Sequence, residues 1–315
     1  MVRNEELALM LTMLWVTSVV QAATLSTPDI PGVVRGGTPI ETLREDFQGS
    51  EGPLALPDGS LLFAENEARR VTRIAVDGSV SEFLSAAAGP NALGLSPRGE
   101  LIAVTTAQPR LVVIHPAANA RTLVDQVLGK PLNRPNDLVI DRKGGVYFTD
   151  PGGRVKPGES PPQPVVYYLS PDGQLRQIAG DVALPNGIQL SPDEKTLYVA
   201  NSQGEFVLAY DVADDGSIKG RRDFARLAGL TTTGNRVAGG ADGLAVDSEG
   251  RLYVATGGGV QVFDSHGAPL GIITLPKSPQ NLAFAGKDKH SLYVVGRGAV
   301  YRITMVAQGF TGRAK

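Results

Sequence analysis

Six copies of one short motif along the chain constrain its fold more than any other feature. Each copy has a polar residue, apolar positions in alternation, a tight turn, and a short apolar run that ends in a small or polar residue. Successive copies start roughly 40 to 56 residues apart, which is the spacing of repeated units such as propeller blades. The polar residues that open the six copies are Glu51, Asn91, Asn136, Asn186, Asp242 and Gln280, the last followed by Asn281.

Within each copy the two apolar runs predict antiparallel strands joined by a hairpin. Two more apolar runs often follow, as at residues 166–178 and 260–273. Four short antiparallel strands make one propeller blade. We therefore predict an all-β fold, a six-bladed β-propeller with four antiparallel strands per blade; a β-sandwich with similar turns is the alternative. The turn-forming pairs between the first two runs include Asp58-Gly59, Arg98-Gly99, Lys143-Gly144 and Glu249-Gly250.

The two ends of the chain indicate how such a ring closes. The sixth copy is followed by a third strand, AVYRITM, with no fourth strand before Lys315. The segment Ile40–Arg44, upstream of the first copy, fits the missing place. We expect this N-terminal segment to complete the last blade, which would remove an exposed sheet edge.

The first residues resemble a secretory signal peptide. Arg3 precedes an apolar run over residues 7–20, and residues 20–22 offer a small-x-Ala cleavage site. The run is shorter than the about 20 residues of a membrane-spanning helix, although glutamates at positions 5 and 6 leave an uncleaved signal anchor as the alternative. We expect a protein exported to the periplasm or secreted, with no stable membrane insertion once the signal is cleaved.

The chain then divides into three parts. Residues 1–22 are assigned to the signal peptide, 23–36 to a linker and 37–315 to the propeller, which forms one catalytic domain. The sequence does not indicate an oligomeric state.

Composition excludes several classes of function. The net charge is −2, which does not indicate nucleic acid or an anionic membrane as a partner. The absence of cysteine excludes disulfides, thiolate zinc sites and a cysteine nucleophile. None of the three histidines, His115, His266 and His290, opens a motif, so a histidine-rich zinc site is not indicated. No G-x-S-x-G nucleophile elbow is present.

The opening residues of the motifs are expected to form a ring around the axis. The first strand of each blade lines the central channel of a propeller. Asn136 lies two positions before Leu138, and Asp242 lies two positions before Leu244, so strand alternation places each pair on one side. Asn91 and Gln280 are expected only to bind water at this ring.

Four members of the ring predict a metal site. Glu51 and Asp242 supply carboxylates, while Asn136 and Asn186 supply amide oxygens. Two carboxylates held close together repel each other unless a cation neutralises them. Hard oxygen ligands suit Ca²⁺ or Mg²⁺ and also accept Mn²⁺.

Loops that follow the second strands are expected to overlook the same end of the channel. The longest covers residues 150–164 and is either a lid or binding loop or a plain connector. Asn201, Ser202 and Thr256 occupy matching places in the fourth and fifth copies. The loop at residues 229–240 lies on this face as well.

Four stretches of the chain carry a family resemblance: EGPLALPDGSLLF, NRPNDLVIDRKGGVYFTD, LPNGIQLSPDEKTLYVANS and GADGLAVDSEGRLYVAT. They resemble the senescence marker protein/gluconolactonase family, which includes regucalcin, with the bacterial lactonases most similar. The resemblance covers residues 45 to 305 approximately. It implies a six-bladed propeller with one divalent cation in the channel, held by Glu51, Asn186 and Asp242. It further implies that Asn136 binds the metal, the substrate or water, and that Arg134 contacts the substrate.

These observations predict a hydrolase that opens a small-molecule lactone or related ester. A divalent cation, with Ca²⁺ first and Zn²⁺, Mn²⁺ or Mg²⁺ as alternatives, would polarise the carbonyl. Asp242 would act as general base. The alternatives on the same scaffold are an organophosphate or other ester hydrolase, a metal-independent condensing enzyme of the strictosidine-synthase type, and a non-catalytic binding module.

Overall fold

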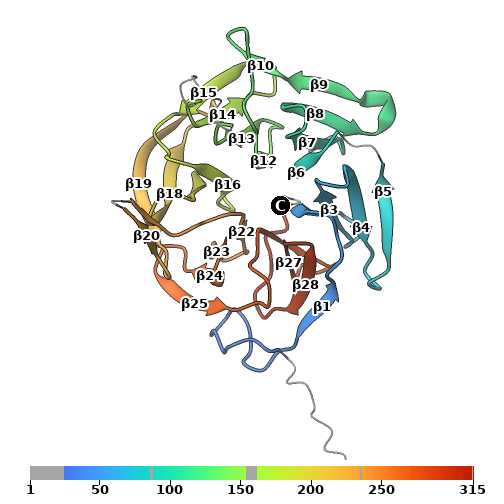
Figure 1. Ribbon diagram of the computed structural model, residues 1–315, viewed down its shortest axis with the longest axis vertical. Coiled ribbons are helices and arrows are strands. Elements are labelled where there is room, and N and C mark those ends of the chain that lie inside the picture. The colour runs from blue at the N-terminus through green and yellow to red at the C-terminus, as the bar shows by residue number, and fades with distance from the viewer. Residues whose placement is uncertain (1–24, 86–87, 154–161, 235, 314) are drawn as a thin grey trace, which may run out of the picture.

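The computed structural model describes residues 25–85, 88–153, 162–234, 236–313 and 315. These residues form six four-stranded antiparallel sheets, arranged as a ring around a central axis (Figure 1). The six-bladed propeller with four antiparallel strands per blade is thereby confirmed. The only helical element in the described residues is the short 3-10 helix η1 (Ala117–Asn119). No helix among them is long and apolar enough to cross a membrane, and the predicted signal peptide lies outside the described part.

Each blade is one sheet whose first strand lies nearest the axis. Blades one and two comprise β2 (Ser50–Ala55), β3 (Leu61–Glu65), β4 (Arg70–Ile74), β5 (Val80–Leu84), β6 (Pro90–Leu95), β7 (Leu101–Thr105), β8 (Arg110–His115) and β9 (Arg121–Val124). Blades three and four comprise β12 (Leu138–Ile140), β13 (Val146–Asp150), β14 (Val165–Leu169), β15 (Leu175–Ala179), β16 (Pro185–Leu190), β17 (Thr196–Asn201), β18 (Phe206–Val212) and β19 (Ile218–Arg226). Blades five and six comprise β22 (Leu244–Val246), β23 (Leu252–Thr256), β24 (Gly259–Phe263), β25 (Pro269–Ile273), β26 (Asn281–Ala285), β27 (Ser291–Gly296), β28 (Ala299–Thr304) and β1 (Ile40–Arg44). Two small hairpins lie outside the blades: β10 (Gln126–Val127) with β11 (Lys130–Pro131), and β20 (Thr231–Thr233) with β21 (Arg236–Ala238).

The sixth blade is completed by the N-terminal strand β1, as the sequence predicted. Ile40 pairs with Ile303 and Glu41 pairs with Arg302. The Arg302 guanidinium also lies 2.6 Å from the Glu41 carboxylate. Segments from opposite ends of the chain therefore form one sheet, and β28 is not left as an open edge.

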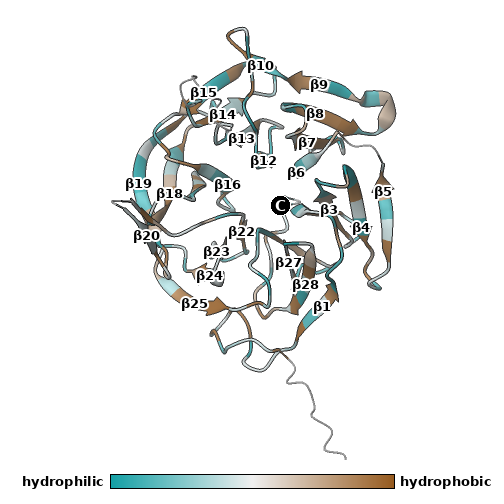
Figure 2. Ribbon diagram, viewed as in Figure 1, coloured by the Kyte–Doolittle hydropathy of each residue, from teal (hydrophilic) through white to brown (hydrophobic). Residues whose placement is uncertain are grey.

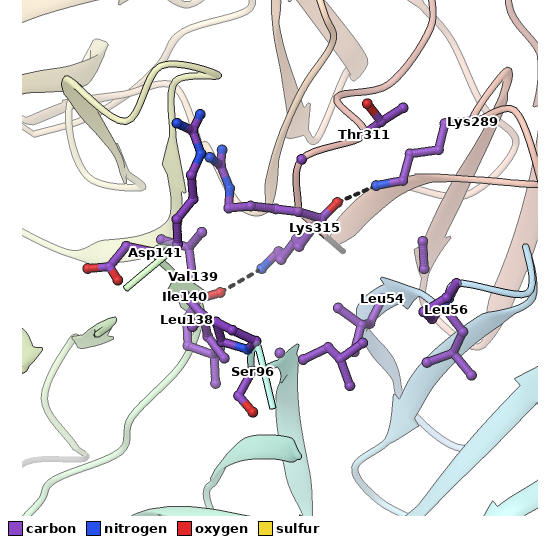
Figure 3. A pocket seen from close by; sticks show the side chains of 18 residues that line it. Leu54, Leu56, Ser96, Leu138, Val139, Ile140, Asp141, Lys289, Thr311 and Lys315 are labelled. Atoms are coloured by element: carbon purple, nitrogen blue, oxygen red, sulfur yellow. Dashed lines mark hydrogen bonds between the residues drawn. The ribbon is translucent and has the colours of Figure 1, made fainter. Parts of the chain in front are cut away.

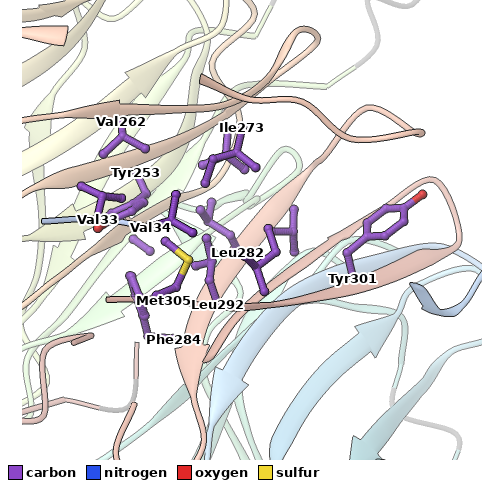
Figure 4. Packing of buried hydrophobic residues seen from close by; sticks show 14 of the residues in the cluster. Val33, Val34, Tyr253, Val262, Ile273, Leu282, Phe284, Leu292, Tyr301 and Met305 are labelled. Atoms are coloured by element: carbon purple, nitrogen blue, oxygen red, sulfur yellow. The ribbon is translucent and has the colours of Figure 1, made fainter. Parts of the chain in front are cut away.

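The segment preceding β1 is packed against the ring, contrary to its assignment as a linker. Ile30, Val33 and Val34 are buried in a cluster with residues of blades five and six. Figure 4 shows Val33 and Val34 with Met305 and Tyr253. The Val33 carbonyl accepts hydrogen bonds from the backbone N–H groups of residues 306 and 307. This segment therefore contributes three apolar side chains to the hydrophobic core of the propeller.

The hydrophobic core lies between neighbouring blades. Val139 and Tyr147 of blade three, for example, pack with Ile188 and Leu197 of blade four. The outermost strands face solvent and carry hydrophilic residues, as β19 shows in teal (Figure 2). Because each blade packs against a neighbouring blade on both faces, its innermost strand is held rigidly beside the channel.

Candidate active site at the upper end of the channel

The predicted ligand residues lie where the innermost strands begin, which we call the upper end of the channel. Glu51 lies in β2 and Asn186 in β16, while Asn136 and Asp242 each lie two residues before β12 and β22. The Glu51 and Asp242 carboxylates are close enough for the charge of Glu51 to raise the pKa of Asp242. The structure thus brings these residues from separate blades to one region.

Local irregularities in the strands set the direction of these side chains. The pairing of β2 with β3 shifts register between Glu51 and Leu54, and that of β16 with β17 shifts between Pro185 and Ile188. Simple alternation between polar and core positions therefore does not run through these motifs. A bulge turns a side chain away from the regular pleat, and here each one lies at a predicted ligand.

Glycines next to the ligands let the innermost strands approach one another. A Cβ atom on Gly52 would lie 2.5 Å from the Cα of Ala92. On Gly187 it would lie 2.3 Å from the Asp242 carbonyl oxygen. Such distances are too short for any side chain, so glycine at these places keeps the ring narrow.

Glu51 is buried and held by donors from blade six. Its side chain accepts hydrogen bonds from Gln280 Nε2 at 3.0 Å, Asn281 Nδ2 at 3.4 Å and the Gly52 N–H at 3.2 Å. Burial, with the nearby charge of Asp137, raises the pKa of Glu51 to about 7. Gln280 therefore orients a carboxylate, which differs from the expectation that it only binds water.

Asp242, which precedes the first strand of blade five, experiences a similar environment. Burial, followed by the charges of Glu51 and Asp137, raises the pKa of Asp242 well above its usual value. The Arg297 guanidinium and the Asn186 side chain act in the opposite direction. Part of the residue's surface nevertheless remains open. A carboxylate so placed favours either a proton or a bound cation.

Asn186 carries the clearest sign of an absent partner. Its Nδ2 donates to Ser202 Oγ at 3.1 Å, and Ser202 Oγ donates to the Ala241 carbonyl at 2.6 Å. The Asn186 Oδ1 atom is buried and finds no donor among the described residues. An unsatisfied buried acceptor is costly, and an oxygen ligand beside two carboxylates matches a hard divalent cation. The residues present therefore fit the cation that the fold implies.

Asn136 is fixed by backbone contacts. Its N–H donates to the Thr149 carbonyl at 2.8 Å, and its carbonyl accepts from Asn91 Nδ2 at 2.9 Å. Asn91 Oδ1 in turn accepts from Asn66 Nδ2 at 3.1 Å. Asn91 thus connects blades one, two and three, where only hydration was expected. Among the described residues no cluster of three or more acidic or histidine side chains forms a metal site by itself, so the candidate set combines carboxylates with amides.

Arg134, the predicted substrate contact, is exposed on the loop before β12. The backbone N–H groups of Asn133 and Arg134 each donate to the Asp150 carboxylate at 2.8 Å. Asp150 is fully buried at the end of β13 and was not singled out as a functional residue from the sequence. Its position at the end of an apolar strand was the available signal. Much of the 150–164 loop, residues 154–161, lies outside the described part.

Comparison with known proteins decides the family. A model described as the SMP-30/gluconolactonase/LRE-like region matches residues 49–297. The chain belongs to this family. The gluconolactonase of Zymomonas mobilis is 30% identical over 309 residues, covering 91% of this chain and 86% of that protein. Lactonase drp35 of Staphylococcus aureus is 29% identical over 252 residues, covering 78% of this chain and 72% of that protein.

Solved structures of family members have the same fold. A putative gluconolactonase superposes with a TM-score of 0.79 at 25% identity, covering 90% of this chain and 99% of its own. A gluconolactonase of Xanthomonas campestris gives 0.76 at 30% identity, covering 90% and 97%. A regucalcin of Agrobacterium tumefaciens, described as calcium-binding, gives 0.71 at 20% identity, covering 86% and 95%; it supports the fold alone.

Proposed function

We propose that this member of the SMP-30/gluconolactonase/LRE-like family is a divalent-cation-dependent lactonase acting at the upper end of its channel. The observation that carries the proposal is the buried Oδ1 of Asn186, which has no donor in the described part of the chain, together with the Glu51 and Asp242 carboxylates. Relatives named gluconolactonase and lactonase support the reaction class. The similarity to the Zymomonas enzyme extends over most of both chains.

The cation would be held by Glu51, Asn186 and Asp242, with Asn136 as a fourth ligand. When bound it would supply Lewis-acid polarisation of the substrate carbonyl. Carboxylate and amide oxygens favour Ca²⁺, with Mg²⁺ and Mn²⁺ next and Zn²⁺ last.

The chain's own residues divide the remaining work. Asp242 would take a proton from the attacking water, because a base works best with a pKa near the working pH. Burial and Glu51 raise the pKa of Asp242, which offsets the lowering that a cation causes. Gln280 and Asn281 hold Glu51 in place. Arg134, exposed above the ring, would orient polar groups of the lactone.

The proposal is tested by metal analysis together with a pH-stat assay on sugar lactones, aliphatic lactones and aryl esters. We expect EDTA to abolish lactone hydrolysis and Ca²⁺ to restore it. Asp242→Ala should lower turnover by about 10³-fold or more, as for loss of a base that is also a ligand, while circular dichroism and the unfolding transition remain those of a folded propeller. Full activity in EDTA, or in Asp242→Ala, would contradict the proposal.

We also propose that residues 1–22 direct export, on the pattern of one arginine, a short apolar run and a small-residue cleavage site. Cell fractionation and N-terminal sequencing test this. The expected mature chain begins at Ala23 outside the cytoplasm; an intact N-terminus in the cytoplasm would contradict it.

A further inference from the structure

The segment that follows β28 crosses the lower end of the channel, where the innermost strands end. The C label in Figure 1 lies at the centre of the ring. Residues 305–307 lie beside Val33 at blade six. The Ser248 N–H of blade five donates to the Gln308 carbonyl at 2.8 Å, and Lys289 Nζ of blade six donates to the Phe310 carbonyl at 2.8 Å.

Two cations of this segment reach blades three and four. Arg313 donates to the carbonyl of Leu190 at 2.5 Å and lies 3.1 Å from the Glu194 carboxylate, both in blade four. Lys315 Nζ forms an ion pair with Asp137 and donates to the Leu138 carbonyl at 3.4 Å, both in blade three. Figure 3 shows Lys315 directed toward Leu138. The segment thus connects blades three, four, five and six.

Both cations are almost fully buried. The exposed fraction of the side chain is 5% for Arg313, 4% for Lys315 and 1% for Asp137. Burying a lone charge is very unfavourable, and breaking such a pair leaves the other charge uncompensated. Specific pairing at this depth indicates a built contact rather than a loosely lying end.

Asp137 links this contact to the candidate cation site. It follows Asn136 directly, and its carboxylate accepts from the N–H groups of Leu138 at 2.8 Å and Ile188 at 3.3 Å. It therefore joins the innermost strands of blades three and four. The charge of Asp137 acts on both Glu51 and Asp242, and Lys315 acts on Glu51 in the opposite sense.

We propose that residues 305–313, with Lys315, form a plug that closes the lower end of the channel, and that Lys315 pairs with Asp137 beneath the candidate cation site, anchoring the plug and offsetting the charge of Asp137. The plug leaves a cavity of about 390 Å³ on the side of blades one to three, lined by Leu54, Leu138 and Lys315 among others (Figure 3). Ligands would then reach the site from the upper end. The effect on the cation rests on the proposed function; the closure does not.

A double-mutant cycle tests the pairing of Lys315 with Asp137. It uses Lys315→Met, Asp137→Asn, the double variant, and Lys315→Arg. We expect urea denaturation of the EDTA-treated protein to show that Lys315→Met is destabilising, that Lys315→Arg is milder, and that the double variant loses less than the sum of the single variants. Additive losses, or a Lys315→Met variant as stable as the parent chain, would overturn the role.

Calorimetric titration with Ca²⁺ provides the second readout. Removing a positive charge near the site should tighten Ca²⁺ binding in Lys315→Met by about tenfold, and Asp137→Asn should weaken it by a similar factor. The double variant should return to near the parent affinity. Weaker binding in Lys315→Met would overturn the charge argument. Absence of Ca²⁺ binding in every protein would instead contradict the proposed function and leave the denaturation cycle to decide Lys315.

Closure is tested with a single thiol, because the chain contains no cysteine. Gln189, fully buried in β16, lies 3.4 Å from Arg313, so Gln189→Cys places a thiol behind the plug. We expect maleimide labelling to accelerate at least tenfold when residues 311–315 are removed. Thr232→Cys, at an exposed strand, should label equally in both backgrounds. Equal rates for Gln189→Cys, with both proteins folded by circular dichroism, would overturn the closure.

Discussion

At the scale of single residues, the two ends of one amide differ. Asn186 Nδ2 has a partner in Ser202, while its Oδ1 has none among the described residues. A protein keeps such an acceptor only where something else satisfies it or its function requires it. The Nδ2 atom therefore contributes to the stability of the folded protein, while the Oδ1 atom is available to bind a cation.

Asn186→Ala is therefore expected to weaken Ca²⁺ binding at least tenfold with little effect on the unliganded protein. The hydrogen bond to Ser202 and the interaction with the Asp242 side chain are lost, so the free energy of unfolding in EDTA should fall by about 1 kcal/mol. Calorimetry and urea denaturation measure the two effects. Ser202→Ala is the control with an intact Oδ1; it loses the same hydrogen bond and also the one from Ser202 to the Ala241 carbonyl. Equal loss of affinity in both variants would contradict a ligand role for Oδ1.

The pKa of Glu51, raised from 4.5 to about 7 chiefly by burial, gives a pH dependence. Between these values the folded protein keeps a proton that the unfolded chain releases, so this group's stabilising contribution is lost as pH rises. EDTA-treated protein should lose unfolding free energy from pH 5 to pH 8. The slope should be smaller in Glu51→Gln and in the parent protein with saturating Ca²⁺. A steeper loss in Glu51→Gln would contradict this assignment.

At the scale of elements, each innermost strand changes character along its length. In β12 and β22 regular pairing begins only after the polar residue, at Leu138 and Leu244; in β2 and β16 a register shift lies at the polar residue. The irregular part aims polar groups at the axis, while the regular part packs between blades. Glycine lies between the polar part and the packed part of such a strand, because a side chain there would overlap the backbone of the neighbouring strand.

Gly187→Ala should lower the free energy of unfolding by about 1–3 kcal/mol, because the added Cβ would overlap the Asp242 carbonyl. The displaced Asp242 should also bind Ca²⁺ more weakly. Gly257→Ala is the control, since its Cβ would meet no atom within 4 Å. Urea denaturation and Ca²⁺ titration of both variants decide the matter; equal stability would show that the strands can separate at no cost.

The sequence predicted those parts of the structure that obey a period. The apolar alternation and the turn pairs predicted strands and blades, because both follow from the local pleat and from turn geometry. The pairing of β1 was predicted because the sixth copy lacks a fourth strand. The shifts at Glu51 and Asn186 break the period and cannot be found by it. Asp137 was missed because its partners come from a distant segment. The positions of Gln280 and Asn91 depend on contacts between blades that no single motif records.

At the scale of the whole molecule, the ring depends on its two ends. β1 closes blade six, and Ile30, Val33 and Val34 fill the core beside it. Without them β28 would present an unpaired edge and the cluster around Tyr253 would open. Exposed edges invite pairing with other chains.

Removal of residues 1–44 should therefore yield a chain that aggregates or unfolds well below the parent temperature. Removal of residues 1–24 alone should leave the melting temperature unchanged, because every described contact remains. Thermal melts and size-exclusion chromatography distinguish the two. A monomeric chain lacking residues 1–44 with the parent melting temperature would contradict the closing role of β1.

The pairing of β1 with β28 also sets a schedule for the nascent polypeptide. Glu41 and Arg302 are 261 positions apart. β1 leaves the ribosome early but cannot pair until β28 has also been synthesised. Contacts of such long range form slowly. The early blades can collapse during synthesis, but the ring itself becomes circular only after translation has passed residue 304. Until then the ring is not closed, so a machinery that moves unfolded chains through a narrow pore can still act on this one.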